Sequence, residues 1–354
     1  MNRLAAAADT GLDLAAGPLL RAVLFDLGPG RRAHLHLTVH HLVIDAVSWR
    51  ILNHDLDLAY RQALDGEAID LGAKTSSFRQ WATRLAEHTA SGGFASQAAH
   101  WDAVPEAAPL PTDGPGPNMV SSQRIMPVRL EQDETAALLH VAPGRFRARV
   151  SDVLLSALAW TICRWSGDDQ LLIEMEGHGR EEIFDDIDLS RTVGWFTSSY
   201  PVALKVPGQT DGEADWPAVV RSVRRCLRAV PGNGLGYGAL RHLAGSGTPP
   251  AEHTPPAVLF NYHSQTEEIT RTADRSLFHA FHDPIGQEQD GRERVVQALE
   301  VVGAVEGGRL GFDLYYSVNL HEPETIARVG SELVAALRSI ARLCEPALGA
   351  EDAR

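Results

Sequence analysis

The sequence predicts an α/β (α+β) fold built from two lobes, because strand and helix patterns alternate along it and a proline-rich segment interrupts them. Residues 105–118 hold five prolines and two glycines, the composition of a linker. We therefore expect one domain at 1–112 and a second at 113–354. With 354 residues, 44% of them hydrophobic, each part is large enough to bury its own core.

The first part opens with a hairpin pattern. An apolar run at 20–27, a turn at 28–31 and a strand at 33–39 follow one another. In the second strand the odd-numbered residues from Leu35 to Val39 are apolar, and the even-numbered ones are histidine or threonine. Since successive strand residues point to opposite faces, we expect the apolar face to meet a core and the other to face a polar space.

Helix patterns follow the hairpin, and strands return after the proline-rich segment. Apolar residues recur at three- and four-residue steps over 47–64, and Gly66 ends that helix. Further helices are predicted from residue 78 to residue 85 and on the approach to Trp101. In the second part we expect helices at 151–165, 218–230 and 323–343 and strands at 170–175, 257–262 and 310–316.

Composition excludes several function classes. The mean hydropathy is −0.14, no apolar run reaches the length of a membrane span, and the first residues lack a signal-peptide pattern, so a soluble cytoplasmic protein is expected. The net charge of −14 and the lack of a basic-aromatic stripe argue against nucleic acid. The three cysteines form no CxxC pair, which favours neither a disulfide framework nor a zinc site.

The run His40-His41-Leu42-Val43-Ile44-Asp45 lies where the predicted strand ends and the long helix begins. His40 and His41 are adjacent, so one should be held in the structure while the other is presented to substrate. Asp45 is suited to cap the helix or to form a buried ion pair. A satisfied polar pair is the alternative; a metal site is disfavoured, because neighbouring histidines diverge and no HxxxH spacing is present.

A second polar run, Glu176-Gly177-His178-Gly179-Arg180-Glu181, directly follows the strand predicted at 170–175. Glycines beside His178 allow a tight turn, and a carboxylate at a strand end is suited to act as a base. The alternative is a solvated acidic loop. Three more motifs stand out: VGWFT at 193–197, GLGYGALR at 234–241 and VLFNY at 258–262. The glycines of GLGYGALR are only a weak signal for phosphate binding.

Together these five motifs, in this order, resemble the epimerization domain of nonribosomal peptide synthetases, a branch of the condensation-domain family. The resemblance implies two chloramphenicol-acetyltransferase-like lobes in a V, with mixed sheets flanked by helices and an active-site channel between the lobes. Only 39 residues precede His40, where family members carry several strands and helices, so the first lobe is expected to be incomplete.

The resemblance also implies an activity, which is inversion from L to D at the α-carbon of an aminoacyl or peptidyl thioester. The thioester is carried on the 4'-phosphopantetheine arm of a carrier protein, and such an isomerase needs no bound cofactor and no metal. The carrier protein and other synthetase domains are the expected partners. The two alternatives are an amide-forming condensation domain, which is not expected to carry EGHGR, and a non-catalytic remnant that docks a carrier.

Site residues are carried over motif by motif. His41 and Glu176 match the catalytic pair, one as acid and the other as base on opposite faces of the α-carbon. Supporting roles are expected for His40, Asp45, Trp49, His178 and Arg180. The substrate channel and the oxyanion contact are expected to involve Asn261, Tyr262, Trp195 and Tyr237.

Two arginine clusters are candidates for binding an acidic carrier protein. The first consists of Arg145, Arg147 and Arg149, and the second of Arg221, Arg224, Arg225 and Arg228. The alternative is a solvated helix face in each case.

Overall fold

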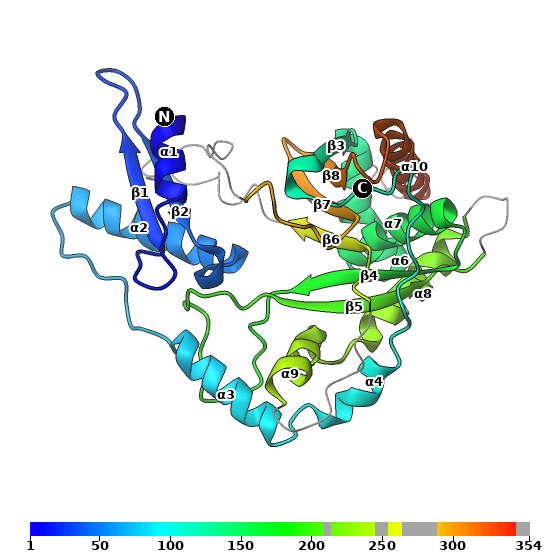
Figure 1. The fold of residues 1–354 in the computed structure, drawn as a ribbon, viewed down its shortest axis with the longest axis horizontal. Helices are drawn as coiled ribbons and strands as arrows, with labels where there is room; N and C mark the ends of the chain where they lie inside the picture. The colour runs from blue at the N-terminus through cyan, green and yellow to red at the C-terminus, as the bar shows by residue number, and fades with distance from the viewer. Residues whose placement is uncertain (209–213, 245–253, 264–288, 345–354) are drawn as a thin grey trace, which may run out of the picture. The chain divides into compact units, whose positions relative to one another are not determined.

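The computed structural model describes residues 1–208, 214–244, 254–263 and 289–344, which fall into two compact units (Figure 1). Unit 1 contains, of these residues, 1–87, 178–197 and 289–290, and unit 2 contains all the others. The division differs from the expected boundary at 112 and 113. The proline-rich segment belongs to unit 2, because Leu110 is buried in the core of that unit and the Asp113 N–H donates to the Leu320 carbonyl at 2.8 Å.

Unit 1 is built on a two-stranded antiparallel sheet in which Leu24 pairs with Leu35. The expected hairpin and the long helix after it are confirmed. The elements of this unit are α1 (Asn2–Asp9), β1 (Leu20–Phe25), β2 (His34–Val39), the 3-10 helix η1 (His41–Val43), α2 (Ala46–Leu64) and the first ten residues of α3 (Phe78–Ala90).

The prediction that the leucine face of β2 meets a core is wrong for the part of the chain that the structure describes. Leu24 is 68% exposed and Leu35 38% exposed. Helix α1 covers the other face instead, where Phe25 is buried and His36 Nε2 lies 3.2 Å from Asp9 Oδ1. Helix α1 packs on the face of the sheet that carries the histidines of β2, because β1 adds the apolar side chains of Val23 and Phe25 to that face. The prediction considered the alternation of β2 alone and therefore did not take these two side chains into account.

Unit 2 is built on a mixed six-stranded sheet of order β3-β8-β7-β6-β4-β5, which confirms the expected mixed sheet. Strand β6 runs parallel to both β4 and β7, and the other pairs are antiparallel. The strands are β3 (Gln123–Arg129), β4 (Gln170–Gly177), β5 (Ser198–Lys205), β6 (Val258–His263), β7 (Leu299–Glu306) and β8 (Arg309–Ser317).

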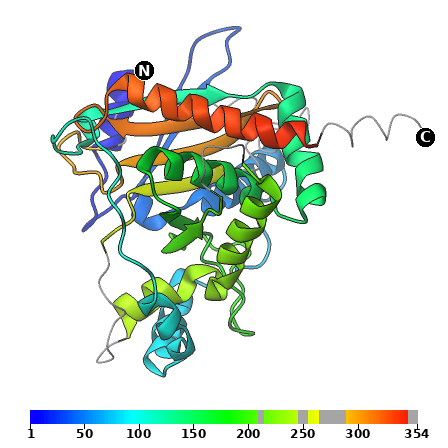
Figure 2. The ribbon, with the colours of Figure 1, turned by 90° about the vertical axis from the view of Figure 1, so that its right-hand side faces the viewer.

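Helices α7 (Val150–Ser166), α8 (Trp216–Ala229) and α10 (Pro323–Arg342) pack on one face of this sheet (Figure 2). All residues from Asp152 to Cys163 of α7 are buried, as its nearly continuous apolar sequence predicts. The shorter helices of unit 2 are η2 (Ala95–Gln97), α4 (Ala98–Asp102), η3 (Val120–Ser122), α5 (Gln132–Ala136), the π-helix η4 (Ala137–Val141), α6 (Ala142–Phe146), η5 (Pro231–Gly234) and α9 (Leu235–Leu243). Within the described ranges, no helix combines the length and the apolarity that a membrane span requires.

Candidate functional site

Asp45 lies at the junction of β2 and α2 and performs both roles that the sequence left open. Its carboxylate caps α2 by accepting from the Ser48 N–H at 2.7 Å. It also forms an ion pair with Arg180, whose Nη1 lies 2.6 Å from Asp45 Oδ2. The Asp45 side chain is 2% exposed and that of Arg180 is 9% exposed, so the pair is buried.

The hydrogen bonds around Asp45 keep it ionised in spite of its burial. Burial alone would raise the pKa of this carboxyl, but the guanidinium of Arg180 and the N–H groups of Phe196 and Ser48 all favour the charged form. The net result is a pKa below its ordinary value. The Arg180 guanidinium also lies 4.1 Å from the centre of the Phe196 ring, a cation–π contact that adds to the pair.

Ser48 joins the two loops at this point, and the sequence analysis did not single it out. Its Oγ donates to the Gly194 carbonyl at 2.9 Å, and accepts from the Gly194 N–H at 3.0 Å and from Arg180 Nη2 at 2.8 Å. The hydroxyl therefore uses its donor and both of its lone pairs inside the protein. Its place in the first turn of α2, three residues after Asp45, was the available signal.

Gly179 permits the approach of the two loops. Its φ is +66°, and a Cβ atom built there would lie 1.6 Å from the carbonyl oxygen of Phe196. The expectation that the glycines beside His178 allow a close backbone approach is therefore confirmed at Gly179.

The two histidines differ, as their adjacency predicted. His40 caps the short helix η1, and its Nδ1 accepts from the Leu42 N–H at 3.2 Å. His41 is exposed, and its ring centre lies 5.0 Å from that of Trp195, which is 43% exposed. His178 supports its own turn, since its Nδ1 accepts from the Arg180 N–H at 3.0 Å. Trp49 lies half-buried on α2.

Glu176 lies in unit 2, on the sheet face opposite the helices. The parallel register that pairs Met175 with Phe260 places Glu176 beside Asn261. The Asn261 side-chain amide donates to Glu176 Oε2 at 2.8 Å. Glu174, two residues earlier on the same face of β4, accepts from Gln297 and Ser199 instead.

Tyr262 and Tyr237, two of the other predicted channel residues, make contacts of their own in unit 2. Tyr262 follows Asn261 on β6, so it points to the opposite face and packs against the core, where burial raises the pKa of its hydroxyl. Tyr237 lies on α9, with its hydroxyl accepting from Arg241 Nη1 at 2.9 Å and its ring centre 5.1 Å from that of Trp101.

The predicted site residues thus form two groups, one in each unit. Unit 1 brings together His41 with Trp195, and Asp45 with Arg180. Unit 2 brings together Glu176 and Asn261. Among the residues that the structure describes, no three His, Cys, Asp or Glu side chains are grouped closely enough to hold a metal ion.

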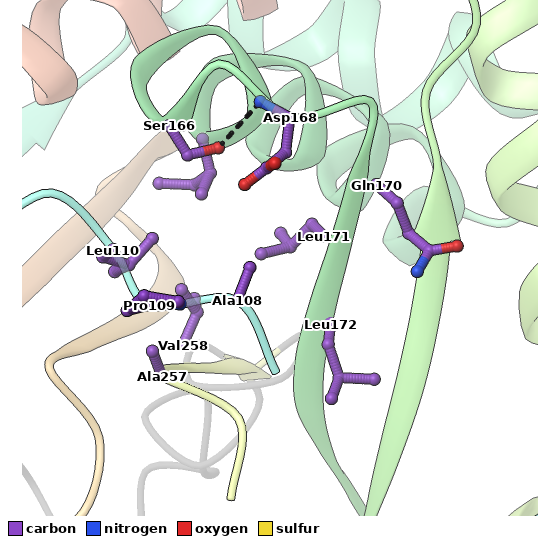
Figure 3. A pocket seen from close by; sticks show the side chains of 11 residues that line it. Ala108, Pro109, Leu110, Ser166, Asp168, Gln170, Leu171, Leu172, Ala257 and Val258 are labelled. Atoms are coloured by element: carbon purple, nitrogen blue, oxygen red, sulfur yellow. Dashed lines mark hydrogen bonds between the residues drawn. The ribbon is translucent and has the colours of Figure 1, made fainter. Parts of the chain in front are cut away.

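A small surface pocket opens elsewhere on unit 2 (Figure 3). Leu171 and Leu172 line it from the start of β4, and Ala257 and Val258 line it at the start of β6. The pocket lies at the amino-terminal ends of the parallel strands β4 and β6. Glu176 lies at the carboxyl-terminal end of β4, which is the opposite end of these strands. The pocket is therefore separate from the predicted site.

Comparison with known proteins covers almost the whole chain. A family model described as "Condensation domain" matches residues 2–353. Chondramide synthase cmdD of Chondromyces crocatus is 39% identical over 339 residues, which are 94% of this chain and 8% of that protein. Bacitracin synthase 3 of Bacillus licheniformis is 32% identical over 345 residues, 97% of this chain and 5% of that protein. The chain thus spans only a small part of these relatives.

Solved structures of proteins from nonribosomal peptide synthetases are also similar to this chain. The epimerization domain from the third module of tyrocidine synthetase B matches with a TM-score of 0.84 at 31% identity, over 97% of this chain and 76% of that chain. The first condensation domain of the CDA synthetase matches with a TM-score of 0.64 at 20% identity, over 91% of this chain and 67% of that chain. At 20% identity the second likeness shows a shared fold alone.

Proposed function

The chain belongs to the condensation domain family, and from this premise we propose that it is an epimerase of aminoacyl or peptidyl thioesters. Its substrate would be tethered to the phosphopantetheine arm of a carrier protein in nonribosomal peptide synthesis. The reaction would invert the α-carbon from L to D without forming or breaking a bond in the peptide backbone.

The observation that carries this proposal is the carboxylate of Glu176 at the end of β4, held by the amide of Asn261 at 2.8 Å. Amide formation from an amine and a thioester does not call for such a carboxylate, whereas removal of an α-proton needs a base. The likeness to an epimerization domain at 31% identity supports the same choice over a condensation activity.

The chemistry follows from the acidity of a thioester. Glu176 would take the α-proton, and the electron pair of the C–H bond would move onto the carbonyl oxygen to give an enolate. The imidazolium of His41 would then return a proton to the opposite face, so that the α-carbon is inverted and one proton has been exchanged. Asn261 would hold the carboxylate in one orientation for this transfer, and Trp195 would hold the imidazole of His41.

The test uses a carrier protein loaded with an L-aminoacyl or L-peptidyl thioester, incubated with the chain in D₂O. We expect D-product with deuterium at the α-carbon. Glu176→Gln should lower the rate about 10²–10⁴-fold, the usual contribution of a positioned acid–base group. Glu174→Gln is the matched control, because it removes a carboxylate from the same face of the same strand and should leave the rate within about a factor of three.

Substitution of His41 separates the two faces of the reaction. His41→Asn should abolish inversion and still allow Glu176 to exchange the α-proton, giving deuterated L-substrate. A new peptide bond in a reaction supplied with an acceptor amine would instead assign the chain to the condensation branch. Carrier binding with neither exchange nor amide formation would mark a docking remnant.

A further inference from the structure

Unit 2 carries a concentration of arginines that the proposed chemistry does not use. Helix α8 contains four arginines and no acidic residue. The segment 142–151, which forms α6 and the start of α7, contains three arginines and no acidic residue. The first carboxylate that follows, Asp152, is buried and accepts from the Arg149 N–H at 2.8 Å.

Arg224 joins these two segments into one surface. Its Nη1 donates to the carbonyl of Phe146 at 3.4 Å and also to that of Arg147. Arg147 has a left-handed backbone, with φ 50° and ψ 45°, which ends α6 and turns this carbonyl toward α8. We call the resulting surface the arginine face; its exposed members are Arg145, Arg147, Arg149, Arg221, Arg225 and Arg228.

The charge of this face is not neutralised locally. Within the described part of the chain, none of its six exposed arginines forms an ion pair with a carboxylate. The chain as a whole has a net charge of −14, so a concentrated positive region here is a departure from the average surface. Opposite charges within about 8 Å of such a face are attracted at physiological salt, while extended polyanions meet the repulsion of the rest of the chain.

Helix α8, which carries part of the arginine face, leads along the chain to the carboxyl end of β4. Arg228 stands near the end of α8, and five residues later the carbonyl of Asn233 lies 3.1 Å from where a Cβ of Gly177 would be. Gly177 is the neighbour of Glu176 and the last residue of β4. The chain thus runs within a few residues from the last arginine of α8 to the end of the strand that carries Glu176.

We propose that the arginine face docks an acidic surface of the carrier protein that presents the thioester. This inference rests on the proposed function for the identity of the partner, and it adds the surface at which that partner binds. The phosphodiester of the phosphopantetheine arm adds one more anion to the same partner.

The test compares two variants that change the charge equally. The docking variant combines Arg221→Glu with Arg225→Glu, two exposed side chains of α8 that make no hydrogen bond to the described residues. The control variant combines Arg124→Glu with Arg328→Glu, two exposed arginines of unit 2 on β3 and α10. Each variant is assayed with a carrier-bound thioester and with the same acyl group on N-acetylcysteamine, a small thioester that needs no docking.

We expect the docking variant to raise KM for the carrier-bound substrate about tenfold, with the small thioester turned over at close to the normal rate. The control variant should leave both rates nearly unchanged. Added salt should weaken the carrier reaction of the unaltered chain more steeply than that of the docking variant. An unchanged KM in the docking variant, or an equal rise in both variants, would overturn the proposal.

Two further measurements keep docking separate from folding and from the reaction. Should the docking variant lose activity toward both substrates, Arg221→Gln with Arg225→Gln replaces it, and the same selective rise in KM is required. Fluorescence anisotropy of a labelled carrier measures binding without turnover. Failure of the proposed function would show as no exchange with either substrate, whereas failure of docking would show as equal carrier affinity in all variants.

Discussion

Replacement of Asp45 by asparagine should break the connection between the two loops of unit 1. The carboxylate accepts from Arg180 at 2.6 Å, from the Ser48 N–H at 2.7 Å and from the Phe196 N–H at 3.0 Å. Removing one partner of a buried ion pair costs about 3–5 kcal/mol, because the other charge stays buried without compensation. Arg180 keeps its bonds to Ser48 Oγ and to the Thr192 carbonyl, so we expect a value near 3 kcal/mol.

Hydrogen exchange provides a local assay for this loss. The amides of Gly194 and Phe196 donate to Ser48 Oγ and to Asp45, and both bonds depend on the loop staying in place. A loss of about 3 kcal/mol corresponds to a fall in protection of roughly 10²-fold at these amides. The double variant with Arg180→Met should be less destabilised than the sum of the two single variants, since the unpaired charge is then removed.

The difference in stability between the unaltered chain and the Asp45→Asn variant should decrease as the pH falls. Because the pKa of Asp45 in the folded chain lies below its ordinary value, the stability it supplies is complete above the ordinary carboxyl pKa and is lost as the pH falls through the lowered one. The unaltered chain and Asp45→Asn should therefore converge in acid. A loss smaller than about 1 kcal/mol at neutral pH, or simple additivity in the double variant, would refute the reasoning.

Three further outcomes can be checked independently. Gly179→Ala should destabilise unit 1 by about 2–5 kcal/mol in urea unfolding, since a Cβ would lie 1.6 Å from the Phe196 carbonyl oxygen at a φ of +66°; a neutral result would contradict the close approach. Burial raises the pKa of the Glu300 carboxyl, so the folded chain loses stability as the pH rises and this side chain has to ionise inside the protein. The variant Glu300→Gln should therefore have a higher melting temperature than the unaltered chain at neutral pH, but not in acid. Burial raises the pKa of the Cys163 thiol to about 12, so iodoacetamide should label half-buried Cys226 in the folded protein and Cys163 only after denaturation, as read by mass spectrometry.

The sequence did not predict strands β3, β5 and β7, and for β3 and β5 the physical reason is the same. Strands β3 and β5 each contain a proline, Pro127 and Pro201, which argues against a strand when only the sequence is considered. Both are the edge strands of the six-stranded sheet, where a missing N–H need not be paired. Edge position is a property of the assembled sheet, so the local pattern could not supply it.

Periodic apolar sequence by itself determined the long helices α7 and α10, because each buries an apolar stripe or nearly its whole surface. The same kind of pattern predicted α2, although its apolar side chains are half-buried or exposed in the structure. It also determined the residue types of the candidate site and their order, since HHxxxD and EGHGRE are read directly from the chain. The tertiary structure decided which of these residues meet: Arg180 reaches Asp45 across 135 positions, and Ser48 reaches Gly194 across 146. Strand register decided that Asn261, and not its neighbour Tyr262, holds Glu176, because adjacent residues of a strand point to opposite faces.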